Sequence, residues 1–149
     1  MSCRSFLLPA LCLLVLAAPA AGAATILPGA RSPTGNIRCV FLGAPSHSLL
    51  CGLGHADYGA QLEARCLLPS GHGVDWHGFL LGPASKGQVN CSGGIQYDPS
   101  TQHPRYLTLA YGRSRKLGPF TCASRPSGLT CTNGRGHGLF LSRQSWRAW

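Results

Sequence analysis

Three residues in one short segment, His72, Asp75 and His77, have side chains that could hold a metal ion or transfer a proton. If this segment is a strand, Asp75 and His77 share one face and His72 lies on the other, because side chains alternate along a strand. Two ligands do not make a specific metal site. We therefore interpret the segment as the solvated start of a strand.

A second histidine position is His137, which lies between two glycines and precedes the apolar run Leu139–Leu141. It could act as a general base or as a ligand on an exposed tight turn. The interpretation we favour is structural: the imidazole ring hydrogen-bonds backbone and locks the turn beside a C-terminal strand.

A histidine-dependent phosphodiester hydrolase is the alternative catalytic hypothesis. It would use two histidines, with arginine or lysine stabilising the charge of the transition state. The candidates are His72, His77, His103 and His137. The residue types are present but have no diagnostic spacing. A nucleophilic serine enzyme is favoured still less, because no G-x-S-x-G motif occurs and the four acids leave few partners to orient a histidine. We expect a binding protein rather than an enzyme.

Six cysteines remain once an N-terminal leader is set aside: Cys39, Cys51, Cys66, Cys91, Cys122 and Cys131. An even number of cysteines in an exported chain predicts three disulfides, although spacing alone leaves many connectivities open. We expect sequential pairing, because each successive pair brackets a turn-rich stretch. No C-x-x-C motif occurs, so we expect no zinc, and we also expect no cofactor. The even count opposes a free catalytic thiol.

The leader itself is residues 1–23, which contain the other two cysteines, Cys3 and Cys12. Arg4 precedes an apolar stretch, Phe6–Leu16, and Ala21-Gly22-Ala23 offers a cleavage site. A membrane anchor is the competing interpretation, but the last third of the segment is Ala, Pro and Gly, which suits cleavage better. We expect a protein that is secreted or periplasmic, without stable membrane insertion.

The chain is strongly basic, with 13 Lys and Arg against 4 Asp and Glu. Such an excess predicts affinity for polyanions, and equally serves to keep an exported protein dispersed. The candidate anion-binding residues are Arg113, Arg115, Lys116, Arg143 and Arg147. The expected partner is an anionic polymer or lipid headgroup of the cell envelope. Nucleic acid remains open but is not specifically indicated, because no aromatic residues alternate with the basic ones.

Short apolar runs separated by Gly, Pro and Ser predict strands over 36–42, 48–53, 74–81, 87–91, 106–110, 120–123, 129–132 and 138–142. One short helix is expected around Ala60–Cys66, where Leu62 and Cys66 share a face. The fold class is therefore all-β: a small disulfide-stapled barrel or sandwich of short antiparallel strands. We expect one monomeric domain over 24–149.

Two turns echo each other along the chain. Pro33-Thr34-Gly35 leads to Cys39, and Pro126-Ser127-Gly128 leads to Cys131. Each has a proline to start the turn and a glycine able to take positive φ before a strand that carries a cysteine. A shorter echo relates Gly71-His72-Gly73 to Gly136-His137-Gly138.

These motifs resemble a family of small secreted bacterial proteins with disulfides that is described only as a domain of unknown function. The similarity lies in the segments 32–39, 110–112, 118–122, 128–133 and 136–143. It spans the mature chain, with a weaker match over 52–90. It implies a secreted, disulfide-bonded single domain, and it carries no known activity.

Three tryptophans complete the candidates. We expect Trp76 in the core, and Trp146 and Trp149 either sealing the base of the fold or forming an exposed lip that binds a protein partner. Sealing is the interpretation we favour. The first functional expectation is thus a non-catalytic basic binding module, with the hydrolase and the protein-binding scaffold as alternatives.

Overall fold

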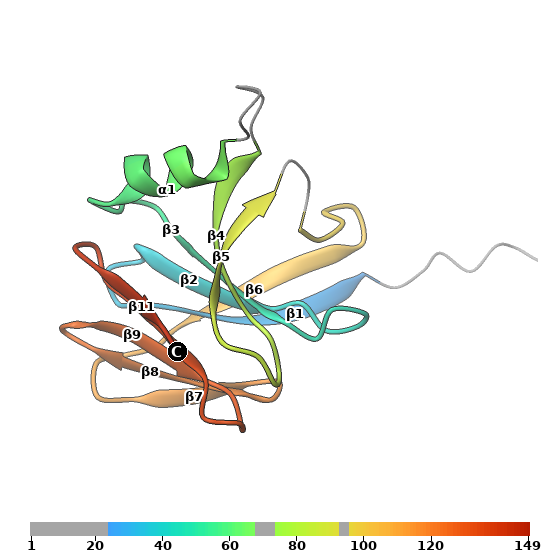
Figure 1. The fold of residues 1–149 in the computed structure, drawn as a ribbon. Coiled ribbons are helices and arrows are strands. Elements are labelled where there is room, and N and C mark those ends of the chain that lie inside the picture. The colour runs from blue at the N-terminus through green and yellow to red at the C-terminus, as the bar shows by residue number, and fades with distance from the viewer. Residues whose placement is uncertain (1–23, 68–73, 93–95) are drawn as a thin grey trace, which may run out of the picture.

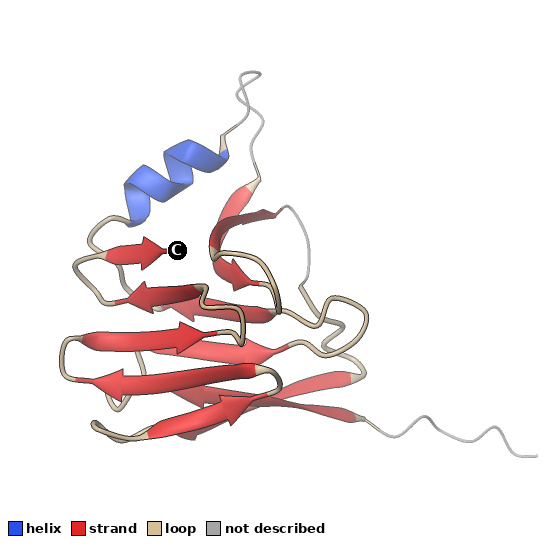
Figure 2. Cartoon of the chain, turned by 60° about the horizontal axis from the view of Figure 1, so that its bottom comes forward, coloured by secondary structure: helices blue, strands red, loops and turns tan. Residues whose placement is uncertain are grey.

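A computed structural model describes residues 24–67, 74–92 and 96–149 of the chain. The expected leader and His72 lie outside the described residues. Two β-sheets stack as layers, and one short helix lies beside β4 at one end (Figures 1 and 2). The predicted all-β class is confirmed, and the architecture is a sandwich.

The first layer is a six-stranded sheet in the order β5-β4-β3-β2-β1-β6. Its strands are β1 (Thr25–Arg31), β2 (Ile37–Phe41), β3 (Leu49–Leu53), β4 (Asp75–Leu81), β5 (Gln88–Ser92) and β6 (Gln102–Thr108). The second layer is a five-stranded sheet in the order β11-β10-β9-β8-β7. Its strands are β7 (Ser114–Leu117), β8 (Phe120–Arg125), β9 (Gly128–Thr132), β10 (Gly138–Leu141) and β11 (Trp146–Ala148).

Three strands were not predicted, namely β1, β7 and β11. Strand β1 contains Pro28-Gly29, a pair that normally argues against a strand interior, and β7 and β11 are too short to show alternation. All strand pairs are antiparallel except β1 with β6, which run parallel. Tertiary pairing therefore overrides weak local preference at these positions.

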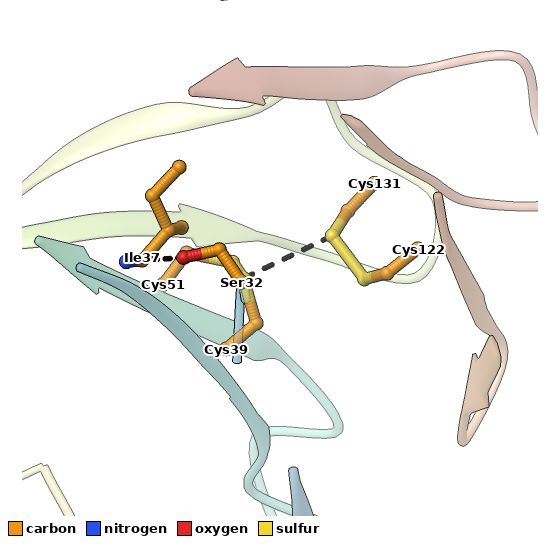
Figure 3. The surroundings of a disulfide bond; sticks show 6 residues. All are labelled: Ser32, Ile37, Cys39, Cys51, Cys122 and Cys131. Atoms are coloured by element: carbon orange, nitrogen blue, oxygen red, sulfur yellow. Dashed lines mark hydrogen bonds between the residues drawn. A yellow bond between two sulfur atoms is a disulfide. The ribbon is translucent and has the colours of Figure 1, made fainter. Parts of the chain in front are cut away.

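The core contains a disulfide from each sheet. Cys39–Cys51 joins opposite residues of β2 and β3, and Cys122–Cys131 joins opposite residues of β8 and β9. The Sγ atoms of Cys39 and Cys131 lie 3.8 Å apart across the core (Figure 3). Neither bonded sulfur carries a hydrogen, so this is a packing contact. The third disulfide, Cys66–Cys91, ties the helix to β5. Sequential pairing is therefore confirmed.

The two similar turns each precede a cysteine of the sulfur contact, Cys39 in one sheet and Cys131 in the other. Gly35 (φ 74°) precedes β2 with Cys39, and Gly128 (φ 149°) begins β9 with Cys131. Both glycines have the positive φ that the sequence predicted. The same kind of turn therefore precedes one central strand in each sheet.

The helix α1 (Gly59–Cys66) buries Leu62 and Cys66, as its spacing predicted. The turn that precedes it is fastened to the second sheet, because the Tyr58 hydroxyl donates to the Ser142 carbonyl at 3.1 Å. Within the described residues no helix is long and apolar enough to cross a membrane.

Candidate basic face

The acidic residues of the chain are confined to the part that precedes the five-stranded sheet. All four acidic residues precede residue 99, and their positions are Asp57, Glu63, Asp75 and Asp98. The strands and loops of the five-stranded sheet, 110–149, contain no acid and seven exposed cations: Arg113, Arg115, Lys116, Arg125, Arg135, Arg143 and Arg147. The formal charges within this segment are therefore all positive.

Strand alternation decides which of these cations share a face. Phe120, Cys122, Leu129, Cys131, Leu139 and Leu141 are buried against the first layer, so their neighbours point outward. One row across the outer surface runs Lys116–Thr121–Thr132–Gly138. The next row runs Ser114–Ala123–Thr130–Phe140–Arg147, and Arg125 lies opposite Gly128 beyond it. We call the outer surface made by these residues the basic face.

Two aromatic rings on the basic face lie over glycines. A Cβ at Gly128 would meet the Phe140 ring at 2.9 Å, and a Cβ at Gly138 would meet the Trp149 ring at 2.5 Å. The rings therefore lie low against the neighbouring strands. The Arg147 guanidinium carbon lies 5.1 Å from the centre of the Trp149 ring. This cation–π contact orders the guanidinium before any ligand arrives.

The structure separates the cations that the sequence grouped together. Arg115 lies opposite Cys122 on the inward-facing side of the β7 edge, whereas Lys116 lies on the basic face. Arg113 precedes β7, and its carbonyl accepts the backbone N–H of Ser124. Inward-pointing charges on an edge strand also hinder pairing with another chain. Arg147 is on β11, four strand spacings from β7, which corresponds to about 19 Å.

Arg143 is already engaged by an acid. Its Nε donates to the Asp57 carboxylate at 2.9 Å, and His55 lies 3.1 Å from the same oxygen. The hydrogen bond from Arg143 is the main reason that the pKa of Asp57 is held below its usual value. Arg143 also lines a small pocket of about 170 Å³ together with Arg125. We therefore leave Arg143 out of the basic face.

Trp146 lies where the sealing interpretation places it, whereas Trp149 lies on the basic face over Gly138 and does not seal the core. The Trp146 ring packs 4.9 Å from Phe79, and Trp76 packs 5.7 Å from Phe79, so both border the core. Trp146 also lines a pocket of about 470 Å³ between the sheet edges, where Arg65 lies 5.8 Å above its ring. Neither C-terminal tryptophan is among the large exposed apolar side chains.

The described histidines are dispersed. His77 is on β4 and His103 on β6, both exposed, whereas His137 lies in the β9–β10 turn. Asn133 is what holds that turn: its Oδ1 accepts the backbone N–H groups of Arg135 and His137. In the part of the chain that the structure describes, the His137 ring shows no hydrogen bond. Sequence reasoning missed Asn133, although an asparagine before a glycine is a turn signal.

Three buried cysteine sulfurs lie within 4.8 Å of one another, those of Cys39, Cys51 and Cys131. All three are committed to disulfides, so they offer no thiolate to a metal ion.

Comparison of this chain with protein-family models, with curated proteins and with solved structures found no match.

Proposed function

We propose that this chain is a non-catalytic binding protein that holds an anionic polysaccharide of the cell envelope on its basic face. The observation that carries the proposal is the absence of acidic residues from 110–149, which holds seven exposed cations, three of them (Lys116, Arg125 and Arg147) on the basic face. On the basic face, Lys116, Arg125 and Arg147 lie opposite residues without charge, so these three cations form an electrostatic footprint for a polyanion.

The shape and chemistry of the basic face favour an extended polymer. Its outward side chains are threonines, low-lying rings and cations, so the surface is broad rather than pocketed. Lys116 and Arg147, at opposite edges about 19 Å apart, suit a ligand with repeated charges. Threonine hydroxyls can donate to and accept from sugar hydroxyls.

A lipid surface is the less favoured occupant. Among the residues that the structure describes, the large exposed apolar side chains are Ile26, Leu67, Leu107 and Tyr111. None of them lies on the basic face, which therefore lacks the apolar anchors that insert into a headgroup layer.

The proposal includes export. Three disulfides are expected to form and persist only in an oxidising compartment, and the predicted leader, residues 1–23, would take the chain there. Export would also bring the basic face to envelope polymers.

The test is binding to dextran sulfate, with neutral dextran as the matched uncharged ligand. We expect binding to dextran sulfate only, weakening as salt rises with about one ion released for each cation contact. The triple variant Lys116→Gln/Arg125→Gln/Arg147→Gln should bind about tenfold or more weakly and show a shallower salt dependence.

The matched control removes three cations from the other layer: Arg31→Gln/Lys86→Gln/Arg105→Gln. This control has the same net charge as the test variant. If both variants bind dextran sulfate equally weakly, binding depends on net charge and not on the basic face, and the proposal is overturned. Tighter binding to single-stranded DNA than to dextran sulfate would replace the polysaccharide with nucleic acid.

A further inference from the structure

The outer surface of the six-stranded sheet, on the far side of the sandwich from the basic face, has its own small apolar cluster. Leu27, Val40 and Leu42 are buried there, and Leu50, Leu80, Tyr97 and Tyr106 pack against them. A hollow of about 320 Å³ opens into the edge of this cluster. Volumes near this value accommodate small organic ligands.

The floor of the hollow is formed by the backbone of Gly52, which has no side chain to fill the space. Gly52 on β3 lies opposite Arg38 on β2, and a Cβ built on Gly52 would meet nothing within 4 Å. Val40, Leu50 and Leu53 supply the apolar wall around it. The space at Gly52 is therefore real, and the backbone there has no positive φ that would require glycine.

The rim of the hollow carries hydrogen-bond donors and no acid. Arg38, His77, Tyr97 and Tyr106 line it, and its lining among the described residues contains no Asp or Glu. Burial raises the pKa of Tyr106, Tyr97 adds to that rise, and Arg38 opposes it. The three groups are thus close enough to influence one another, and Tyr106 stays protonated as a donor at neutral pH.

We propose that this hollow binds a small carboxylate with an apolar six-membered ring. One guanidinium and two phenols would meet the two carboxylate oxygens, since a planar guanidinium matches carboxylate geometry. The ring would lie on the Gly52 floor against the apolar wall. Repeated charges are not required, because Arg38 is the only arginine that lines the described hollow.

The probe is benzoate, followed in amide NMR spectra of the ¹⁵N-labelled protein, with benzyl alcohol as the uncharged match. Benzoate should shift the Gly52 and Gly54 amides, with a Kd of about 1 mM or tighter. Gly52→Val should abolish these shifts by filling the floor, and Arg38→Gln should weaken binding about tenfold while the fold is retained.

Gly134→Val is the matched control, because Gly134 also has open space and no positive φ but lies in the β9–β10 turn. It should leave benzoate binding unchanged. The proposal is overturned if benzoate at about 10 mM leaves both amides unmoved. It is also overturned if Gly52→Val binds as well as the unmodified protein, or if benzyl alcohol binds as tightly as benzoate. None of these outcomes affects dextran sulfate binding, which uses the opposite face.

Discussion

The two sheets share one kind of inner face and differ in their outer faces. Inside, each sheet presents a cross-strand disulfide surrounded by leucine and phenylalanine. Outside, the five-stranded sheet shows threonines and unopposed cations, whereas the six-stranded sheet shows leucines, tyrosines and a hollow. Successive residues of a strand face opposite sides of the sheet. Each sheet can therefore pack one set of side chains into the core and present a different set to solvent.

The largest expected effect is the loss of stability when one of the two core disulfides is removed. Replacing Cys39 and Cys51 with alanine, or Cys122 and Cys131, should each lower the free energy of unfolding by about 3 kcal/mol or more. Because the Cys39 and Cys131 sulfurs touch, the quadruple variant should deviate from the sum of the two doubles. Urea unfolding of the four proteins measures this.

The third disulfide is the control for that experiment. Cys66–Cys91 closes a longer loop, but Cys91 is exposed, so its removal costs little packing. If Cys66→Ala/Cys91→Ala proves the most destabilising of the three pairs, chain entropy rather than the packed sulfur contact dominates the stability of the sandwich.

The next effect distinguishes the outer faces. Each sheet has a glycine under an aromatic ring: a Cβ at Gly138 would lie 2.5 Å from Trp149, and one at Gly29 would lie 2.8 Å from Tyr106. Either alanine substitution should cost about 1–3 kcal/mol. Gly138→Ala should weaken dextran sulfate binding, because Trp149 no longer orders Arg147. Gly29→Ala should weaken benzoate binding instead. Equal loss of both ligands in either variant would contradict the independence of the two faces.

A smaller effect on stability is expected at Tyr58, whose hydroxyl donates to the Ser142 carbonyl and so connects the two layers. Burial raises the pKa of Tyr58 to about 12, from an ordinary value of 10.0. The folded state therefore holds this proton more tightly than the unfolded state, so the contribution is complete below pH 10.0 and is lost as the pH rises through about 12. Tyr58→Phe should flatten this alkaline decline and cost about 1 kcal/mol at neutral pH, through the lost bond to Ser142.

Tyr111→Phe serves as the comparison for Tyr58, because Tyr111 is exposed. At neutral pH, Tyr111→Phe should leave the free energy of unfolding nearly unchanged, because an exposed phenol loses little packing. If the free energy of unfolding of Tyr58→Phe falls at alkaline pH as steeply as that of the unmodified protein, the Tyr58 phenol is not the cause of the decline.

The smallest effect is expected at Asp57, which is exposed. Arg143 lowers the pKa of its carboxyl below the ordinary value of 3.8, so the contribution is present above that value and is lost as the pH falls through the lower, folded-state pKa. Asp57→Asn should slightly reduce the acid sensitivity of unfolding measured from about pH 6 to about pH 2.

Asp98 provides the contrast to Asp57. Hydrogen bonds from Ser100 lower its pKa within a single turn of the first layer. Asp98→Asn should therefore reduce acid sensitivity without affecting contact between the layers. If Asp57→Asn disturbs the amide NMR signals of neither Arg143 nor Ser142, the ion pair does not help to join the two sheets.

Much of the fold could be predicted from local pattern. Hairpin neighbours are close in sequence, so the sequential pairing of Cys39 with Cys51 and of Cys122 with Cys131 follows once the turns between them are recognised. The glycines at positive φ, Gly35 and Gly128, were predicted for the same reason, because turn chemistry acts within a few residues. The short helix was predicted from one i, i+4 pair.

The sequence by itself determined the all-β class, the disulfide framework and the excess of positive charge, because these depend on composition and on neighbours a few residues apart. Only the tertiary structure decided that β1 pairs with β6, that Lys116 rather than Arg115 lies on the basic face, and that Gly52 lines a hollow beside Tyr106. The reason is physical: register and sheet order arise from contacts between distant segments, and a shift of one residue would move every side chain of a strand to the other face.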